Sequence, residues 1–116
     1  MNITIHEGGI AELISDKREI REIQDALDIM ANSRYQGAGS VIIYEHQLIP
    51  EFFDLKSGVA GEILQKFSNY KMKLAIVGDF SKYGSKSLRD FIYESNKGGR
   101  ICFVSTTEEA IAVLSK

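Results

Sequence analysis

The stretch from Val41 to Val77 decides the fold. It opens with Val41-Ile42-Ile43-Tyr44 and closes with Leu74-Ala75-Ile76-Val77. Each run is short, continuously apolar and rich in β-branched or aromatic residues, which is typical of a strand buried on both faces of a sheet. Between the runs, apolar residues recur at helical spacing, at Val59, Ala60, Ile63, Leu64 and Phe67. A strand–helix–strand unit predicts parallel strands joined by a right-handed crossover.

Toward the N-terminus, the sequence predicts a hairpin and a helix. Ile3–His6 alternates like a strand, Gly8-Gly9 is a tight-turn signal, and residues 10–14 read as the second arm. A helical stripe follows and ends at Gly37 and Gly39. Its members are Ile20, Ile23, Leu27, Met30 and Arg34.

Toward the C-terminus, a polar loop over residues 78–86 precedes a third helix marked by Leu88, Phe91 and Ile92. Ser87 is the expected N-cap of this helix. Ile101–Val104 is the last apolar strand, and residues 106–109 (TTEE) form a capping box before a final helix.

The element order is therefore β-β-α-β-α-β-α-β-α, which predicts an α/β fold in a single domain spanning residues 1–116. We expect a four- or five-stranded mixed sheet with helices mainly on one face. The predicted core comprises Ile5, Leu13, Ile23, Leu27, Met30, Ile42, Ile63, Leu64, Phe67, Ala75, Val77, Leu88, Ile92, Phe103 and Leu114.

Composition narrows the classes of function. The chain has 116 residues, and its net charge of −2 offers no basic field for nucleic acid. No apolar run reaches the roughly 18 residues of a membrane span, and the first residues lack a signal core, so we expect a cytoplasmic protein without a membrane partner. Cys102 is the only cysteine, and His6 and His46 are the only histidines. These are too few for a convincing zinc site, so neither a metal nor a cofactor is expected.

Five segments of the chain are similar to a bacterial family known as domain of unknown function 4180. They are residues 24–28 (QDALD), 52–56 (FFDLK), 61–67 (GEILQKF), 78–83 (GDFSKY) and, most distinctively, 87–96 (SLRDFIYESN). This family supplies no established activity.

More loosely, the element order resembles the STAS domain of anti-sigma-factor antagonists. Such domains place a strand before an Asp-Ser-Ser-Gly stretch that opens a helix, where this chain has residues 54–58 (DLKSG). They also end with an apolar strand and a Thr/Ser-rich cap, as in residues 103–110 (FVSTTEEA). The resemblance implies a regulatory fold and makes Ser57 a candidate phosphorylation site. Leu55 and Lys56 separate Asp54 from Ser57, which departs from the pattern of phosphorylated members.

Two segments are candidates for binding a ligand or partner, because both follow strands whose carboxyl ends share one edge of the sheet. The first is Lys56, Ser57 and Gly58, where serine and helix N–H groups suit an anion but also suit simple capping. The second combines aromatic, hydroxyl and basic side chains, in Asp79, Phe80, Ser81, Lys82, Tyr83, Ser85, Lys86 and Arg89. Such a loop suits a partner surface or a nucleotide-like ligand, whereas the competing explanation is loop solvation and helix capping.

No set of catalytic residues is evident in the sequence. The leading hypothesis is therefore a non-enzymatic, STAS-like regulatory module that acts through protein–protein binding or self-association. The alternative is a small-ligand binder that sequesters or senses a nucleotide or another anionic metabolite. An unrecognised hydrolase is the third and weakest reading.

Overall fold

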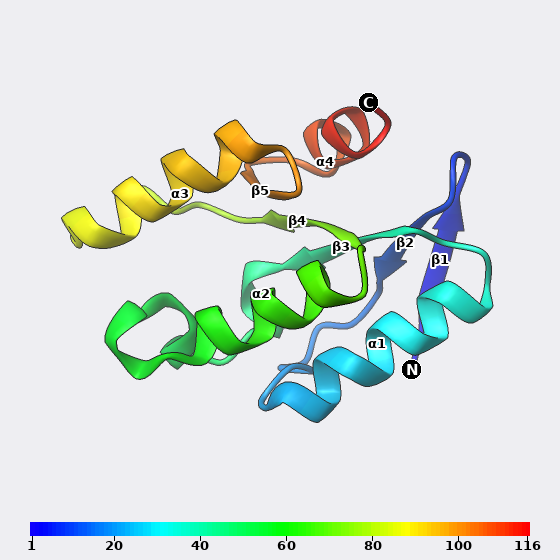
Figure 1. The fold of residues 1–116 in the computed structure, drawn as a ribbon, viewed down its shortest axis with the longest axis horizontal. Helices are drawn as coiled ribbons and strands as arrows, with labels where there is room; N and C mark the ends of the chain where they lie inside the picture. The colour runs from blue at the N-terminus through cyan, green and yellow to red at the C-terminus, as the bar shows by residue number, and fades with distance from the viewer.

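The computed structural model describes all 116 residues and contains one five-stranded sheet with four α-helices (Figure 1). The strands lie in chain order across the sheet. They are β1 (Ile3–His6), β2 (Ile10–Leu13), β3 (Ser40–Tyr44), β4 (Lys73–Val77) and β5 (Ile101–Val104). The pair β1–β2 is antiparallel and the other pairs are parallel, so the predicted α/β fold with a mixed sheet is confirmed.

The helices cover the two faces of the sheet unequally. They are α1 (Ile23–Tyr35), α2 (Val59–Asn69), α3 (Lys86–Gly98) and α4 (Thr107–Leu114). Helices α1, α2 and α3 each join neighbouring parallel strands in the same direction, so right-handed crossovers put all three on one face. Helix α4 follows the last strand and packs on the other face against β3, β4 and β5.

Successive residues of the strands point to opposite faces of the sheet and contribute to two separate apolar cores. Val41, Ile43, Leu74 and Ile76 join residues of α1, α2 and α3 in a cluster of 19 buried side chains. Ile42, Ala75 and Val77 point the other way and join Ala110 and Leu114 of α4 in a cluster of six. This two-sided burial explains why the strands are continuously apolar.

Most of the predicted core is correct, with Ile5 as the clear error. Ile5 is 38% exposed, because β1 is an edge strand that no helix contacts extensively. Ile23, Leu27 and Ile92 are only partly buried. The buried residues of α1 are instead Ala26, Ile29, Met30 and Ser33. The small Ala26 and Ser33 belong to the buried face, and a pattern that ranks side chains by bulk overlooks such positions.

Two helix starts differ from the sequence prediction. Ile20 lies outside α1, in a bridge with Leu48, and the Asp25 carboxylate accepts from the N–H groups of Arg21 and Glu22 at the helix start. The N-cap of α3 is Ser85 rather than Ser87: its Oγ accepts from the Leu88 N–H at 3.1 Å.

The N-cap expected for the last helix is confirmed. Thr106 Oγ1 accepts from the Glu109 N–H at the start of α4.

The connection from β3 to α2 consists of three single-turn 3₁₀ helices, Glu45–Gln47, Pro50–Phe53 and Leu55–Ser57. Phe52 and Phe53 are buried and belong to the larger core. This connection therefore closes the carboxyl end of the sheet with apolar side chains.

Candidate functional site

A cleft of about 430 Å³ lies where β3 and β4 end. It is lined by Arg18, Tyr44, Glu45, His46, Leu48, Pro50, Phe53, Val77, Gly78, Lys82 and Tyr83. Three of these residues, Gly78, Lys82 and Tyr83, belong to the polar loop over residues 78–86, and Lys82 and Tyr83 are among the candidate binding residues. The cleft is therefore at the edge of the sheet where a ligand would be expected in an open α/β fold.

Glu45 anchors the loop to this cleft. Its Oε2 accepts from Lys82 Nζ at 2.7 Å and from the Tyr83 hydroxyl, and its Oε1 accepts from the Asp79 N–H at 3.2 Å. The side chain of Glu45 is only 14% exposed. Burial, together with the hydrogen bond to Glu45, raises the pKa of Tyr83, so the phenol remains a neutral donor.

Gly78 is the residue that lets Glu45 reach the loop. A Cβ at this position would lie 2.6 Å from both Cβ and Oε1 of Glu45. We expect Gly78→Ala to lower the free energy of unfolding by about 1–3 kcal/mol, because the Glu45 Cβ is fixed to the backbone. Chemical denaturation should measure this loss.

Gly84→Ala is the matched control for that substitution, in the same loop. A Cβ at Gly84 meets no atom within 4 Å, and its φ is not positive. Stability should therefore change little or rise slightly. Equal losses for the two variants would contradict the proposed close approach at Gly78.

The aromatic residues of the loop pack inward. The Tyr83 ring stacks on Phe53 with centroids 5.0 Å apart, and Phe80 meets Phe103 edge-on at 5.3 Å. Both rings are partly buried against the larger core. Packing thus explains two aromatics in a polar loop and leaves less ring surface for stacking a ligand.

The other polar residues of the loop have local partners. Asp79 accepts from the N–H and hydroxyl of Ser81, and these bonds lower the pKa of Asp79. Lys86 pairs with Asp90 at 2.8 Å on the exposed surface of α3. The guanidinium of Arg89 donates to the Gly84 carbonyl.

The segment Lys56–Gly58 does not line the cleft. Ser57 Oγ lies 2.6 Å from the Glu51 carbonyl and 2.7 Å from the Asp54 carbonyl, and it accepts from the Val59 N–H. Gly58 adopts a positive φ of 80° just before α2. The exposed Ser57 hydroxyl therefore stabilises the turn that leads into α2.

A second polar cluster, which the sequence did not predict, joins β1, β2, β3 and α4. Glu12 binds His6 Nε2 at 2.7 Å and the Tyr44 hydroxyl at 2.6 Å, and that hydroxyl also contacts Thr107 Oγ1. Burial and the hydrogen bond to Glu12 raise the pKa of Tyr44. Alternation along the strands could have placed Glu12 and Tyr44 on one face, but their contact with Thr107 depends on how α4 packs.

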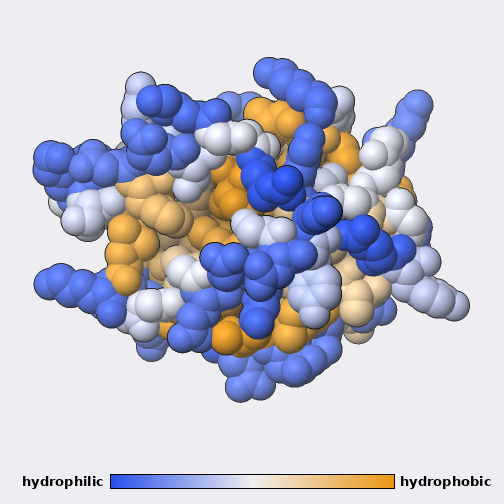
Figure 2. All heavy atoms as spheres, in the orientation of Figure 1, coloured by the Kyte–Doolittle hydropathy of each residue, from blue (hydrophilic) through white to orange (hydrophobic).

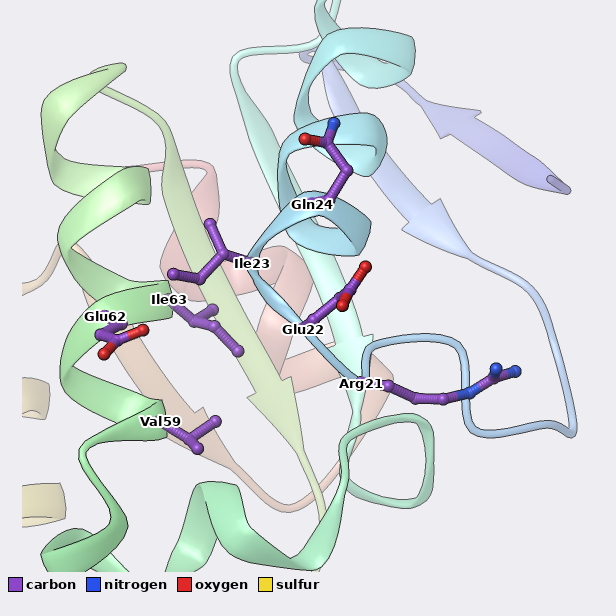
Figure 3. A pocket seen from close by; sticks show the side chains of 7 residues that line it. All are labelled: Arg21, Glu22, Ile23, Gln24, Val59, Glu62 and Ile63. Carbon is purple, nitrogen blue, oxygen red and sulfur yellow. The ribbon is translucent and has the colours of Figure 1, made fainter.

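The third feature is a surface groove between α1 and α2. Near their N-termini, a hollow of about 450 Å³ is lined by Arg21, Glu22, Ile23, Gln24, Val59, Glu62 and Ile63 (Figure 3). A second hollow of about 320 Å³ shares Gln24 and is lined by Leu27, Asp28, Met30, Ala31, Arg34, Tyr70 and Met72. We call the two adjoining hollows the α1–α2 groove.

The α1–α2 groove has an apolar floor and a polar rim. Ile23 and Ile63 lie between the two helices in Figure 3, whereas Tyr70 is largely exposed at the other end. Figure 2 shows apolar residues reaching the surface among hydrophilic side chains on the molecular face drawn in Figure 1.

Neither a metal centre nor a membrane span is found in the structure. No group of three or more His, Cys, Asp or Glu side chains is arranged to hold a metal ion. No helix has both the length and the apolar character needed to cross a bilayer. Burial raises the pKa of the Cys102 thiol, which lowers its reactivity.

These features define a small α/β domain with three helices on one face, a loop anchored at the carboxyl end of the sheet and a surface groove. The family model for a domain of unknown function, DUF4180, matches residues 6–114, and the chain belongs to that family. No curated protein matches the chain. No solved structure matches it either.

Proposed function

We propose that this chain is a non-enzymatic regulatory module that binds an amphipathic helix of a partner protein in the α1–α2 groove. The proposal rests on the apolar floor of the groove, where Ile23, Leu27 and Val59 are only partly buried and no other element of the chain packs over them. Grooves between helices accept amphipathic helices through side chains spaced three and four residues apart. Helix α1 has 13 residues and is about 20 Å long, which matches three to four turns of a partner helix.

Charge on the rim specifies the chemistry of the partner. Glu22 and Glu62 are exposed beside Arg21 at one end of the groove, so this end carries more negative than positive charge, and neither carboxylate takes part in an ion pair. Arg34 lies at the other end beside the exposed Asp28. The partner helix should therefore carry Lys or Arg beside Glu22 and Glu62, because complementary charge sets orientation and specificity.

A small-ligand function has one observation in its favour, the cleft beside Lys82 with Arg18 and His46 on its rim. Against it, the Glu45 carboxylate already pairs with Lys82 inside that cleft and would repel an anion. A nucleotide-induced rise in melting temperature that Lys82→Ala abolishes would favour this second function.

Site-specific photocrosslinking tests the groove. A photoreactive benzoylphenylalanine at Gln24, an exposed position shared by both hollows, should crosslink a partner in host cells. Mass spectrometry should map the crosslink to an amphipathic helix with a basic end. Glu62→Lys should reduce the crosslink about tenfold or more, because it places like charges together.

Glu94→Lys is the matched control, since Glu94 is an exposed acidic residue on α3 outside the groove. It should leave the crosslink intact. A crosslinked segment without amphipathic character, or equal yields with Glu62→Lys and Glu94→Lys, would refute helix binding in the groove.

A further inference from the structure

The two edge strands of the sheet differ in whether their outer main-chain groups are hydrogen-bonded. At the β5 edge, the Asn96 side chain donates to the Phe103 carbonyl at 3.2 Å and accepts from the Phe103 N–H at 2.7 Å. This amide occupies main-chain groups that another strand would need, which is a way to block edge pairing. At the other edge, β1 pairs only with β2, and its outer main-chain groups have no hydrogen-bond partner.

The register of the hairpin identifies these outer groups. The Asn2 carbonyl accepts from the Ile14 N–H, so Asn2 faces β2. Main-chain direction alternates along an antiparallel strand. Thr4 therefore also faces β2, and the N–H and C=O groups of Ile3 and Ile5 point outward.

The β1 edge lacks the usual protection against pairing. Residues 3–5 (ITI) contain no charge and no proline, and Ile5 is 38% exposed. In Figure 1, β1 lies at the border of the sheet opposite to β5, and no further strand of the sheet pairs with its outer side.

This edge is complementary to itself. Residues 3–5 read the same in both directions, so a two-fold axis at Thr4 places Ile3 opposite Ile5 of a second copy. Thr4 then lies opposite Thr4 of that copy. The Ile3–Ile5 and Thr4–Thr4 pairs are favourable cross-strand pairs. In the same register, the outward N–H and C=O groups of Ile3 and Ile5 form main-chain hydrogen bonds with the second copy.

We propose that a second copy of this chain pairs antiparallel along β1, so that two five-stranded sheets become one continuous sheet. The two-fold axis is perpendicular to that sheet, which puts α1, α2 and α3 of both copies on the same face. Two α1–α2 grooves then share one surface, although the pairing itself does not depend on what the grooves bind. Two four-residue strands alone bury less than the roughly 1,200 Å² of a standard interface, so association should be weak and concentration dependent.

Sedimentation velocity over a concentration series tests the proposal with the full chain. Wild type should shift from monomer to dimer as concentration rises. Ile5→Lys should weaken dimerisation at least tenfold, since it adds a charge at the pairing edge. Ile14→Lys is the control: Ile14 is 40% exposed but lies beyond the end of β2 rather than on the edge. It should dimerise like wild type, with circular dichroism confirming that both variants fold.

Disulfide trapping provides a second readout. Thr4→Cys should form a symmetric intermolecular disulfide under mild oxidation, because a directly opposed pair without main-chain hydrogen bonds has Cα atoms about 4.5 Å apart. Asn2→Cys should not, since the same register separates the two thiols by about 14 Å along the strands. The native Cys102 is buried and should not interfere.

Three outcomes would overturn the proposal. The first is a wild type that remains monomeric throughout and a Thr4→Cys variant that forms no disulfide. The second is a dimer that Ile5→Lys leaves unchanged. The third is trapping of Thr4→Cys, in host cells, to a different protein rather than to itself, which would assign the edge to a foreign strand.

Discussion

Gln47→Leu is expected to lower the free energy of unfolding by about 2–4 kcal/mol, although it replaces a polar residue with an apolar one of similar size. Gln47 is fully buried. Its Nε2 donates to the carbonyls of Leu13 and Ser15, and its Oε1 accepts from the Tyr44 N–H. Leucine removes these partners and leaves main-chain groups of two neighbouring strand ends unsatisfied, which costs more than the gain in apolar burial.

Urea denaturation should measure this loss, with Gln65→Leu as the control. Gln65 is exposed on α2, and its amide bonds only to the side chain of Asn69. The control should change stability by no more than about 0.5 kcal/mol. If Gln47→Leu were as stable as Gln65→Leu, the three hydrogen bonds of Gln47 would not be what stabilises the carboxyl ends of β2 and β3.

The architecture could be predicted from the sequence because its strands carry a local signal. Val41–Tyr44 and Leu74–Val77 are apolar at every position, and only a strand covered on both sides requires this. The exposure of Ile5 could not be predicted in the same way. Its alternation with polar residues matches a half-buried strand, but whether a helix covers β1 depends on tertiary packing.

Helix boundaries were less predictable because several residues satisfied the same local rule. Ser85 and Ser87 both precede apolar helical residues, and either could cap the helix. Helix α3 begins at Lys86, with Ser85 as its N-cap. In this arrangement Leu88 is buried and Lys86 pairs with Asp90. The capping pattern in the sequence does not reveal these contacts, so it could not show which serine caps the helix.

Only some of the residues that the sequence selected as candidates meet at the cleft, because the segment Lys56–Gly58 lies outside it. The sequence placed Lys82 and Tyr83 at the carboxyl end of the sheet, and they do line the cleft there. It gave no sign that Glu45, 37 or more residues earlier in the chain, would bind both. The α1–α2 groove was also not foreseen, since a groove arises from the spacing of two packed helices rather than from either helix alone.

The second large effect is expected for Ile63→Ala, which should lower the free energy of unfolding by about 2–5 kcal/mol. Ile63 on α2 is 1% exposed and belongs to the larger core beneath the groove. Truncation removes apolar contacts and leaves a cavity that rigid neighbours fill only in part. Leu27→Ala should cost about 1 kcal/mol, because Leu27 is only partly buried at the groove surface.

Chemical denaturation of both variants distinguishes a core position from a groove position on adjoining helices. Equal losses would mean that Leu27 is packed as tightly as Ile63, and the groove would then lack an accessible floor. If Leu27→Ala instead leaves stability close to that of wild type and weakens the crosslink formed from Gln24, the Leu27 side chain contributes to partner binding rather than to folding. Both residues belong to the apolar stripe of a helix, so the sequence pattern does not distinguish them. The structure does, because Ile63 is among the buried residues of α2 whereas Leu27 is not among those of α1.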